Sequence, residues 1–488
     1  MMMNAVSSRN PRLKTVVHIL SRMILLEAVL MFGSTAVAAF YDSGDVITLL
    51  VSGGITFGTG VVCSILSKPK DVVIDRKLGY IVVALIWLTI SFFGSLPFII
   101  GGYIPSITDA WFETVSGFTT TGATILDNVE LLPKGIMFWR CLTQWVGGIG
   151  IVVVVVAFMQ IEGGGGMSLI SAEMVGPEKG KITPSTRQTG RILVVIYYVL
   201  TLTCGLAYWL GGMSLYDAVC HSFATVSSGG FSTKDASAAA FGINIQYLMM
   251  LFMIPAGANF ILIYNLFKGK FSWVKRNEEF KLYIFLIFAI SLIVSVLNYT
   301  ADKGVELTLR EGFFQVISVI STTGFTTANY GLWGTLAIFF ICIMMVTGSM
   351  SGSTSGGIKL VRVIVLVKNV RNIIKMNFHN RALIPVKLDG RNVPSSVLYN
   401  VLAVFLLYIA VFIVATLLLT LAGLNFTEAL EGCLSCLGCV GTICIDTAHH
   451  TFSAFPDAAK WIFSILMYLG RLEIVTVIII FLPSFWKR

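Results

Sequence analysis

The strongest constraint on this chain is a unit that occurs four times: an apolar segment, a short segment, a run that ends on glycine, and a second apolar segment. The first three runs are rich in hydroxyl groups and the fourth is altered. They are Thr119-Thr120-Thr121-Gly122, Ser227-Ser228-Gly229-Gly230, Ser321-Thr322-Thr323-Gly324 and Ser435-Cys436-Leu437-Gly438-Cys439-Val440-Gly441. An internal repeat of this kind predicts one structural unit built four times and assembled side by side.

Composition places these units in a membrane. Hydrophobic residues make up 56% of the chain and charged residues 12%, with a mean hydropathy of +0.86, which excludes an ordinary soluble domain. A helix needs roughly 20 apolar residues to cross a bilayer. Ten segments qualify: 15–40, 45–66, 79–102, 136–161, 191–211, 243–267, 282–298, 332–361, 397–423 and 458–485. The predicted fold is therefore all-α and polytopic, with two leading transmembrane helices before the four units.

The net charge of +9 is distributed unevenly between the two sides of the membrane. Connections on one side carry 20 Lys and Arg against 7 Asp and Glu, and those on the other side carry 5 against 15. This bias marks the basic side as cytoplasmic. Ten spans then place both termini in the cytoplasm and all four glycine runs on the outer side. The basic surfaces suit lipid headgroups or a protein partner, and no nucleic-acid partner is expected.

The short segment of each unit is too short to span a bilayer and too apolar for an ordinary loop. These segments cover residues 108–121, 214–228, 308–323 and 425–440. We interpret them as re-entrant half-helices. Helix-opening residues support this in three units, at Thr108-Asp109, at Ser214 and at Asn425.

Polar residues recur at one position within these segments. Glu113, His221 and Gln315 each precede the final glycine of their run by nine residues. The spacing supports equivalent units, and we predict that these side chains cap or brace the half-helices. Arg140, near the outer start of the next span, is likewise predicted to brace the structure rather than to contact ions.

Four glycine-ending runs on one axis have the chemistry of a cation pore. Backbone carbonyls can replace the water around a cation without holding it too tightly, and glycine permits the backbone angles that this requires. The alternative is that the small residues only pack helices together. The predicted K⁺ filter residues are Thr120, Thr121, Gly122, Ser228, Gly229, Gly230, Thr322, Thr323, Gly324, Cys439, Val440 and Gly441.

Two further features are predicted to form a gate. Residues 347–357 interrupt an apolar span with four glycines and four serines, which predicts an unwound segment inside the membrane. Arg471 lies near the middle of the last span, where a charge is costly unless it faces a cavity or a partner. A structural salt bridge is the alternative role for Arg471. The predicted gate residues are Arg471, Gly348, Ser349, Gly352, Ser353, Gly356, Gly357 and Lys359.

Several motifs together resemble the bacterial TrkH/TrkG and KtrB superfamily of K⁺ transporters, over the whole chain. Besides the glycine runs, they are Gln144-Trp145-Val146-Gly147-Gly148-Ile149-Gly150, the segment 348–359 and Gly470-Arg471-Leu472-Glu473-Ile474. The two leading spans point to the TrkH branch. The resemblance implies K⁺ uptake across the bacterial inner membrane, filter glycines at 122, 230, 324 and 441, and preference for K⁺ over Na⁺ from the glycine at 122. It also implies that the loop and Arg471 obstruct the pore, that the chain is a homodimer, and that its cytoplasmic face docks a TrkA-like ring that binds NAD or ATP.

The fourth run leaves two alternatives open. Cys439-Val440-Gly441-Thr442 keeps the glycine but differs from the family around it, so weak K⁺/Na⁺ discrimination or Na⁺ or H⁺ coupling in the same fold is one alternative. The cysteines at 433, 436, 439 and 444 resemble an iron–sulfur ligand run, so a membrane metal or redox protein is the other. On a helix, residues three apart are rotated by about 300° around the axis and residues six apart by about 600°, so these thiols splay, which favours packing as their role.

No catalytic group of residues stands out, so we expect no enzyme and no organic cofactor, with K⁺ as the bound and transported ion. The predicted domains are 1–70, the N-terminal pair of helices; 71–190, unit 1; 191–280, unit 2; 281–396, unit 3 with the gating loop; and 397–488, unit 4.

Overall fold

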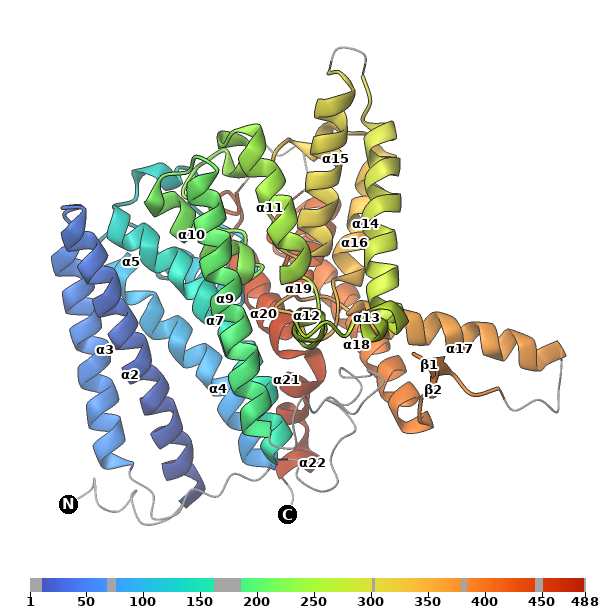
Figure 1. Cartoon of the computed structure of the whole chain (residues 1–488). Coiled ribbons are helices and arrows are strands. Elements are labelled where there is room, and N and C mark those ends of the chain that lie inside the picture. Colours follow the sequence, from blue (N-terminus) through green and yellow to red (C-terminus); the bar gives the residue numbers. More distant parts are fainter. Residues whose placement is uncertain are drawn as a thin grey trace.

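The computed structural model describes residues 11–67, 76–161, 186–300, 303–378, 384–443 and 451–486. This part of the chain is predominantly helical, with one two-stranded hairpin of β1 (Lys387–Leu388) and β2 (Arg391–Asn392). The start of α2 (Pro11–Phe40) and the short helix α22 (Pro483–Trp486) lie at the same end of the bundle (Figure 1).

The two leading helices form an antiparallel pair at one edge of the molecule. Helix α2 packs along α3 (Val46–Leu66), and both are drawn in blue in Figure 1. Asp45, in the turn between them, accepts a 2.6 Å hydrogen bond from the backbone N–H of Ile136. That N–H belongs to the first turn of α7 (Lys134–Ile161), where it has no partner within the helix. The pair is therefore attached to unit 1 through a helix cap.

Each of the four units has a first long helix, a short helix and a second long helix. In unit 1 these are α4 (Arg76–Gly94) with α5 (Leu96–Ile100), α6 (Ile107–Phe118) and α7, and in unit 2 they are α9 (Thr186–Leu210), α10 (Leu215–Val226) and α11 (Ile243–Ala256) with α12 (Phe260–Phe267). Unit 3 has α14 (Glu278–Leu297), α15 (Val305–Ile320) and α16 (Thr335–Thr347), followed by α17 (Leu360–Phe378). Unit 4 has α18 (Ser395–Leu421), α19 (Phe426–Gly438) and α20 (Asp457–Leu472) with α21 (Ile474–Phe481). The remaining short helices are α13 (Phe271–Arg276), η1 (Val129–Leu131), η2 (Ser237–Ala240) and η3 (Tyr330–Leu332). The predicted all-α architecture of two leading helices and four repeated units is confirmed.

Three of the four short helices begin at a residue whose side chain caps the helix, although not always at the residue expected. Helix α10 opens at Ser214 and α19 at Asn425, as predicted, and Asn425 forms a capping box with Glu428. Helix α6 is capped by Ser106, two residues before Thr108, and α15 starts at Val305 after Gly304, three residues before Thr308. The expected starts of these two helices were wrong: Ser106 caps α6 earlier in the chain, and α15 begins after Gly304 without a side-chain cap.

Three of the ten predicted spans are not continuous helices. Helices α11 and α12 meet at 102°, α20 and α21 meet at 110°, and residues 348–359 separate α16 from α17. In the described residues, the first helix of every unit and the two leading helices are long and apolar enough to cross a membrane unbroken. The breaks therefore belong to the second helices of units 2, 3 and 4, and they face the middle of the molecule, where neighbouring backbone supplies hydrogen bonds.

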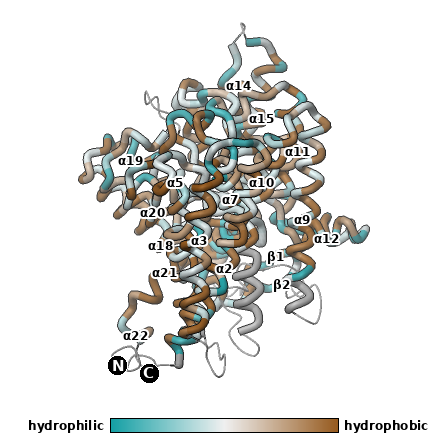
Figure 2. The backbone as a smooth tube through the Cα atoms, turned by 90° about the vertical axis from the view of Figure 1, so that its left-hand side faces the viewer, coloured by the Kyte–Doolittle hydropathy of each residue, from teal (hydrophilic) through white to brown (hydrophobic). Residues whose placement is uncertain are grey.

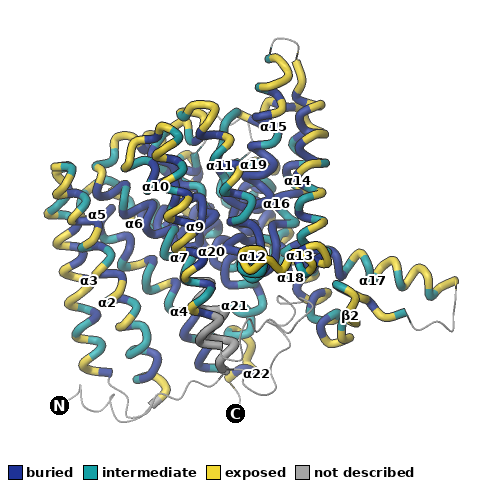
Figure 3. Tube along the Cα trace, viewed as in Figure 1, coloured by how far each residue is buried: buried dark blue, intermediate teal, exposed yellow. Residues whose placement is uncertain are grey.

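Burial follows the same division between centre and periphery. Buried residues gather around the short helices, and exposed ones cover the outer helices (Figure 3). Ile47, Leu202 and Leu421 are more than 70% exposed on the outer faces of α3, α9 and α18. The outer helices are largely hydrophobic in Figure 2, which suits contact with lipid rather than water.

Candidate functional site: a ring of four glycines above a central loop

The backbone takes the same path at the end of all four short helices. Two residues before each final glycine lies a left-handed residue, and the glycine is left-handed as well. The first set is Thr120, Ser228, Thr322 and Cys439, with φ between 52° and 56°; the glycines are Gly122, Gly230, Gly324 and Gly441, with φ between 77° and 87°. Left-handed backbone is costly for residues other than glycine. Its recurrence at one position therefore shows that the four runs fold as equivalents.

The four segments 120–122, 228–230, 322–324 and 439–441 close into a ring, called the glycine ring below. Each glycine lies against a backbone carbonyl of the next unit. A Cβ atom would collide with the oxygen of Gly229 if built on Gly122, of Thr323 if built on Gly230, of Val440 if built on Gly324, and of Thr121 if built on Gly441. The order runs from unit 1 to unit 4 and back to unit 1. All twelve predicted filter residues thus come together around one axis.

Glycine is required in the ring for two separate reasons, namely its positive φ and the close carbonyl of the neighbour. The two residues before each glycine are buried, and each glycine is partly exposed. Hydroxyl groups within the runs bond to one another: Thr119 Oγ1 lies 2.8 Å from Thr121 Oγ1, and Ser321 Oγ lies 2.8 Å from Thr323 Oγ1.

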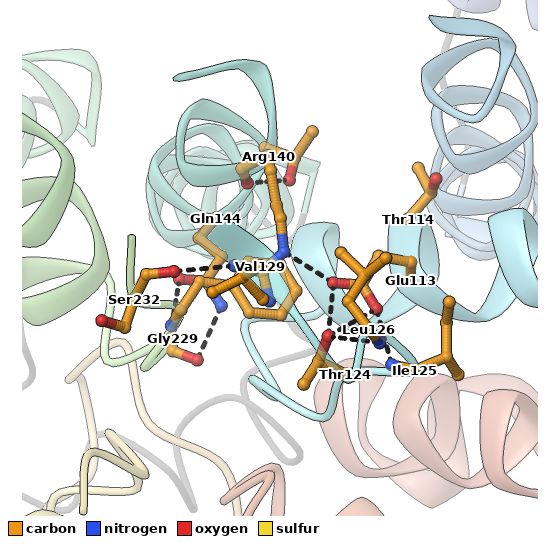
Figure 4. A network of polar contacts seen from close by, with 12 residues as sticks. Glu113, Thr114, Thr124, Ile125, Leu126, Val129, Arg140, Gln144, Gly229 and Ser232 are labelled. Atoms are coloured by element: carbon orange, nitrogen blue, oxygen red, sulfur yellow. Dashed lines mark hydrogen bonds and ion pairs between the residues drawn. The ribbon is translucent and has the colours of Figure 1, made fainter. Parts of the chain in front are cut away.

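Glu113 braces the backbone that leaves the first ring segment. Its carboxylate accepts hydrogen bonds from Thr124 Oγ1 at 3.0 Å and from the backbone N–H of Ile125 at 2.9 Å. It also forms a buried ion pair with Arg140 on α7, with 2.6 Å between Nε and Oε1 (Figure 4). The predicted bracing roles of Glu113 and Arg140 are confirmed.

Helix α7 also supports the second ring segment, through two side chains. Arg140 Nη1 donates to the carbonyl of Ser232 at 3.1 Å, and its guanidinium lies 3.5 Å from the centre of the Phe231 ring. Gln144 Nε2 donates to the carbonyl of Gly229 at 2.6 Å, and Gln144 Oε1 accepts from the N–H of Phe231 at 3.0 Å (Figure 4). Sequence reasoning missed this role of Gln144, whose only signal was an amide inside an apolar span.

The other polar residues at the equivalent position behave differently from one unit to the next. His221 repeats the brace, with Nε2 3.0 Å from Ser232 Oγ. The buried amide of Gln315 has no hydrogen-bond partner among the described residues. In unit 4 the position is Gly432, and the ring of Phe463 fills the space of its missing side chain. The bracing prediction is confirmed for two units, and the fourth unit is held by apolar packing.

A loop of residues 348–359, called the central loop below, lies against three of the four ring segments. Thr354 Oγ1 is 2.9 Å from Ser228 Oγ, and the N–H of Gly356 donates to Thr322 Oγ1 at 3.2 Å. A Cβ atom on Gly356 would lie 2.6 Å from the carbonyl oxygen of Gly438 and 2.8 Å from Cys439 Cβ. The loop thus touches the left-handed residues of units 2, 3 and 4.

Polar contacts hold the central loop in place. Ser349 Oγ donates to the carbonyl of Gly257, and Asn259 Nδ2 donates to the carbonyl of Ser351 at 2.6 Å. The hydroxyls of Ser353 and Ser355 lie 2.6 Å apart, and Lys359 Nζ donates to the carbonyl of Ser355 at 2.7 Å. Gly352 packs on Asn259, and Gly348 packs on Gly357 at the base. The segment is unwound, as predicted, and the bonds of its hydroxyls and backbone to neighbours hold it in one conformation.

Arg471 links the central loop to unit 1. Its side chain is 4% exposed. Nη1 donates to the carbonyl of Thr354, and Nη2 donates to the carbonyl of Gly147 on α7 at 3.0 Å. The residue is the second-last of α20, two residues before the break at Glu473, rather than in the middle of a straight span as predicted. The nearby carboxylate of Glu473 pairs with Arg362 at 2.7 Å. The hydrogen-bond partners identified for Arg471 are instead the two carbonyls.

The cysteines of unit 4 lie in packed surroundings. Cys433, Cys436 and Cys439 are buried, and Cys433 and Cys439 direct their sulfur atoms toward the carbonyls of Phe412 and Met467. Within the described ranges, no three His, Cys, Asp or Glu side chains are grouped as metal ligands. Cys444 lies outside the described residues. The described part of the run offers no support for a redox centre.

The site is therefore a ring of four equivalent units closed around one axis. A family model described as "TrkH: Cation transport protein" matches residues 55–488, and the chain belongs to that family of transport proteins rather than enzymes.

Proteins of similar sequence and structure match this chain over most of its length and of their own. The Trk system potassium uptake protein TrkH of Halomonas elongata is 33% identical over 98% of this chain and 100% of its own. TrkH of Escherichia coli K12 is 36% identical over 86% and 88%, and TrkG of the same strain is 32% identical over 97% and 99%. The crystal structure of the potassium transporter TrkH from Vibrio parahaemolyticus matches with a TM-score of 0.88 and 31% identity, over 97% of this chain and 100% of that one.

Proposed function

We propose that the chain takes up K⁺ across the bacterial cytoplasmic membrane, with the glycine ring as its selectivity filter. The observation that carries this proposal is the closed order of contacts, in which each ring glycine lies against a carbonyl of the next unit. The relatives are K⁺ uptake proteins by name, which supports K⁺ as the transported ion.

The ring has the chemistry that a dehydrated cation needs. Within unit 1 the hydroxyls of Thr119 and Thr121 bond to each other, and within unit 3 those of Ser321 and Thr323 do the same, which leaves backbone carbonyls as the principal ligands. Carbonyl dipoles bind the ion without a fixed negative charge, so the ion can also leave. The proposed ion ligands are the backbone groups of the three residues in each ring segment, with the altered unit 4 completing the fourth wall.

The central loop and Arg471 form the proposed gate. The loop lies against three ring segments, and Arg471 joins it to Gly147 of the remaining unit, so together they close the space next to the ring. A guanidinium keeps its charge at any working pH and repels a cation. Opening therefore requires the loop to separate from Ser228 and Thr322 and the arginine to leave its carbonyl partners.

The proposed setting follows from charge and from the relatives. Both termini lie in the cytoplasm, next to the basic connections, and these surfaces dock a TrkA-like nucleotide-binding ring and contact lipid. The chain acts as a homodimer with one pore per copy. Residues 1–70 attach to the pore, and 71–190, 191–280, 281–396 and 397–488 are its four units.

Substitution of Gly122 tests the filter. Gly122→Ser adds a side chain that collides with the carbonyl of Gly229, at φ 87°. The matched control is Gly102→Ser, at φ 68° with nothing within 4 Å of the added Cβ. Flux of K⁺, Rb⁺ and Na⁺ into proteoliposomes at fixed voltage is expected to show a K⁺/Na⁺ ratio about tenfold lower in Gly122→Ser, and no change in Gly102→Ser. Equal K⁺/Na⁺ flux ratios in the two variants would show that the glycine ring is not the selectivity filter. A K⁺/Na⁺ ratio near one in the unmodified chain would favour a weakly selective transporter.

A further inference from the structure

A single carboxylate binds both the central loop and the first turn of the helix that follows it. Glu279 lies in the first turn of α14 and is 4% exposed. Its Oε1 accepts from the backbone N–H of Ser351 at 2.7 Å and from that of Val361 at 3.1 Å. Its Oε2 accepts from Ser351 Oγ at 3.0 Å. Three donors, one from the first turn of α17 and two from the loop, thus meet on one side chain.

Two features of the site strengthen the hydrogen bonds that Glu279 accepts. Val361 lies in the first turn of α17, where a backbone N–H has no partner within the helix and the helix dipole favours a negative charge. When the carboxylate of Glu279 is ionised, these hydrogen bonds are shorter and stronger than bonds between neutral groups. Burial removes the competition from water that would weaken them.

Ser351 lies close in the chain to the residue through which the loop contacts both the ring and Arg471. Thr354 follows three residues later, touches Ser228 and accepts the bond from Arg471. A change at Glu279 therefore reaches the proposed gate through a short piece of backbone, without touching the ring itself.

The same turn of α14 is tied to elements outside the bundle. Glu278 pairs with Lys368 of α17, and its N–H donates to Asp389 at 2.7 Å, in the turn of the β1–β2 hairpin. Helix α17 extends sideways from the bundle in Figure 1. A partner that binds α17 or the hairpin thus acts directly on the turn that carries Glu279.

We propose that Glu279 is a positioning residue of the gate, whose carboxylate holds the central loop against the ring and couples it to α17. This inference rests on the proposed function of the loop. Movement of α17 away from α14 breaks the bond to Val361, and the loop is released from its blocking position.

The test measures K⁺ flux of the purified full-length chain in proteoliposomes. Glu279→Gln removes the charge and keeps the size, and we expect about a tenfold rise in flux, which is about 1.4 kcal/mol taken from the closed state. Ser351→Ala removes one of the three donors and is expected to give a smaller rise. Glu279→Asp keeps the charge and is expected to stay nearer to the unmodified chain. The K⁺/Na⁺ ratio stays unchanged in all three variants.

Glu306→Gln is the matched control, because it removes the charge of an exposed glutamate in the first turn of α15 without touching the central loop or α17. We expect it to leave flux within twofold of the unmodified chain. An equal rise in Glu306→Gln would overturn the proposal, since loss of any glutamate charge would then explain both effects. A purely structural role for Glu279 predicts lower flux in Glu279→Gln, which also overturns it.

Hydrogen exchange adds a second readout in case Glu279→Gln reconstitutes poorly. Peptides that cover residues 349–358 are expected to exchange faster in Glu279→Gln and in Ser351→Ala, with other peptides unchanged. Unchanged hydrogen exchange of these peptides in folded protein would contradict the proposal.

Deletion of residues 349–356 separates this proposal from the proposed function. If the deletion raises flux and Glu279→Gln does not, the loop is supported as the gate and the proposed role of Glu279 is wrong. If neither change raises flux, the loop is not the gate and both proposals fail.

Discussion

Replacement of Arg140 by methionine should be among the most damaging single changes next to the glycine ring. The Arg140–Glu113 pair is 2.6 Å long, and its side chains are 2% and 0% exposed. Methionine retains most of the length of the side chain and removes the charge. It leaves Glu113 as a buried carboxylate without its cation and removes the bond to Ser232 and the contact with Phe231.

The expected cost follows from this burial. Removal of one partner of a buried pair typically destabilises a protein by about 3–5 kcal/mol. The matched control is Lys234→Met, which breaks a 3.4 Å pair with Glu130 whose side chains are 36% and 45% exposed. Exposed pairs contribute about 0–1 kcal/mol. Denaturant titration of the two variants in detergent micelles should therefore separate them by at least about 2 kcal/mol.

A double variant tests the mechanism of the loss. Glu113→Gln with Arg140→Met removes both charges and should recover part of the stability, because no uncompensated charge stays buried. The K⁺/Na⁺ flux ratio should fall in Arg140→Met, since both the first and the second ring segments lose support. The reasoning is refuted if Arg140→Met is no less stable than Lys234→Met.

Three further outcomes are expected in flux and stability assays. Gln144→Leu should lower the K⁺/Na⁺ ratio while the fold persists, because the carbonyl of Gly229 and the N–H of Phe231 each lose a bond worth about 0.5–1.5 kcal/mol; an unchanged ratio would show that the ring keeps its shape unaided. Arg471→Ala and Arg471→Gln should both raise K⁺ flux without altering selectivity, and poor folding with normal conduction in both would indicate a structural role instead. Deletion of residues 349–356 should raise flux, since Gly348 and Gly357 already lie together at the base of the loop and can be joined; loss of flux in folded, inserted protein would make the loop part of the conducting state.

Much of the architecture is readable from the sequence because the bilayer imposes simple rules. A helix must be long and apolar to cross, so apolar length reveals the leading pair and the first helix of each unit. The spacing of Glu113 and His221 before their glycines predicted bracing contacts that the structure contains.

The breaks in the second helices of the units were not predicted from apolar length. Apolar length runs through 243–267 and 458–485 as it would through straight spans, yet these segments bend at 102° and 110°. At the first of these bends the backbone N–H of Phe260 has its partner in another unit, the carbonyl of Gly352, at 3.2 Å. Such partners are distant in sequence and leave no local pattern.

The sequence by itself determined the membrane class, the fourfold repeat and the residue types of the ring, since these depend on local composition and on backbone freedom at glycine. Only the tertiary structure decided which groups meet: Gln144 with Gly229, Glu279 with Ser351 and Val361, and Arg471 with carbonyls rather than a carboxylate. Each of these contacts joins segments at least 72 residues apart. Their formation depends on how the four units close around the axis, which no local property of the chain specifies.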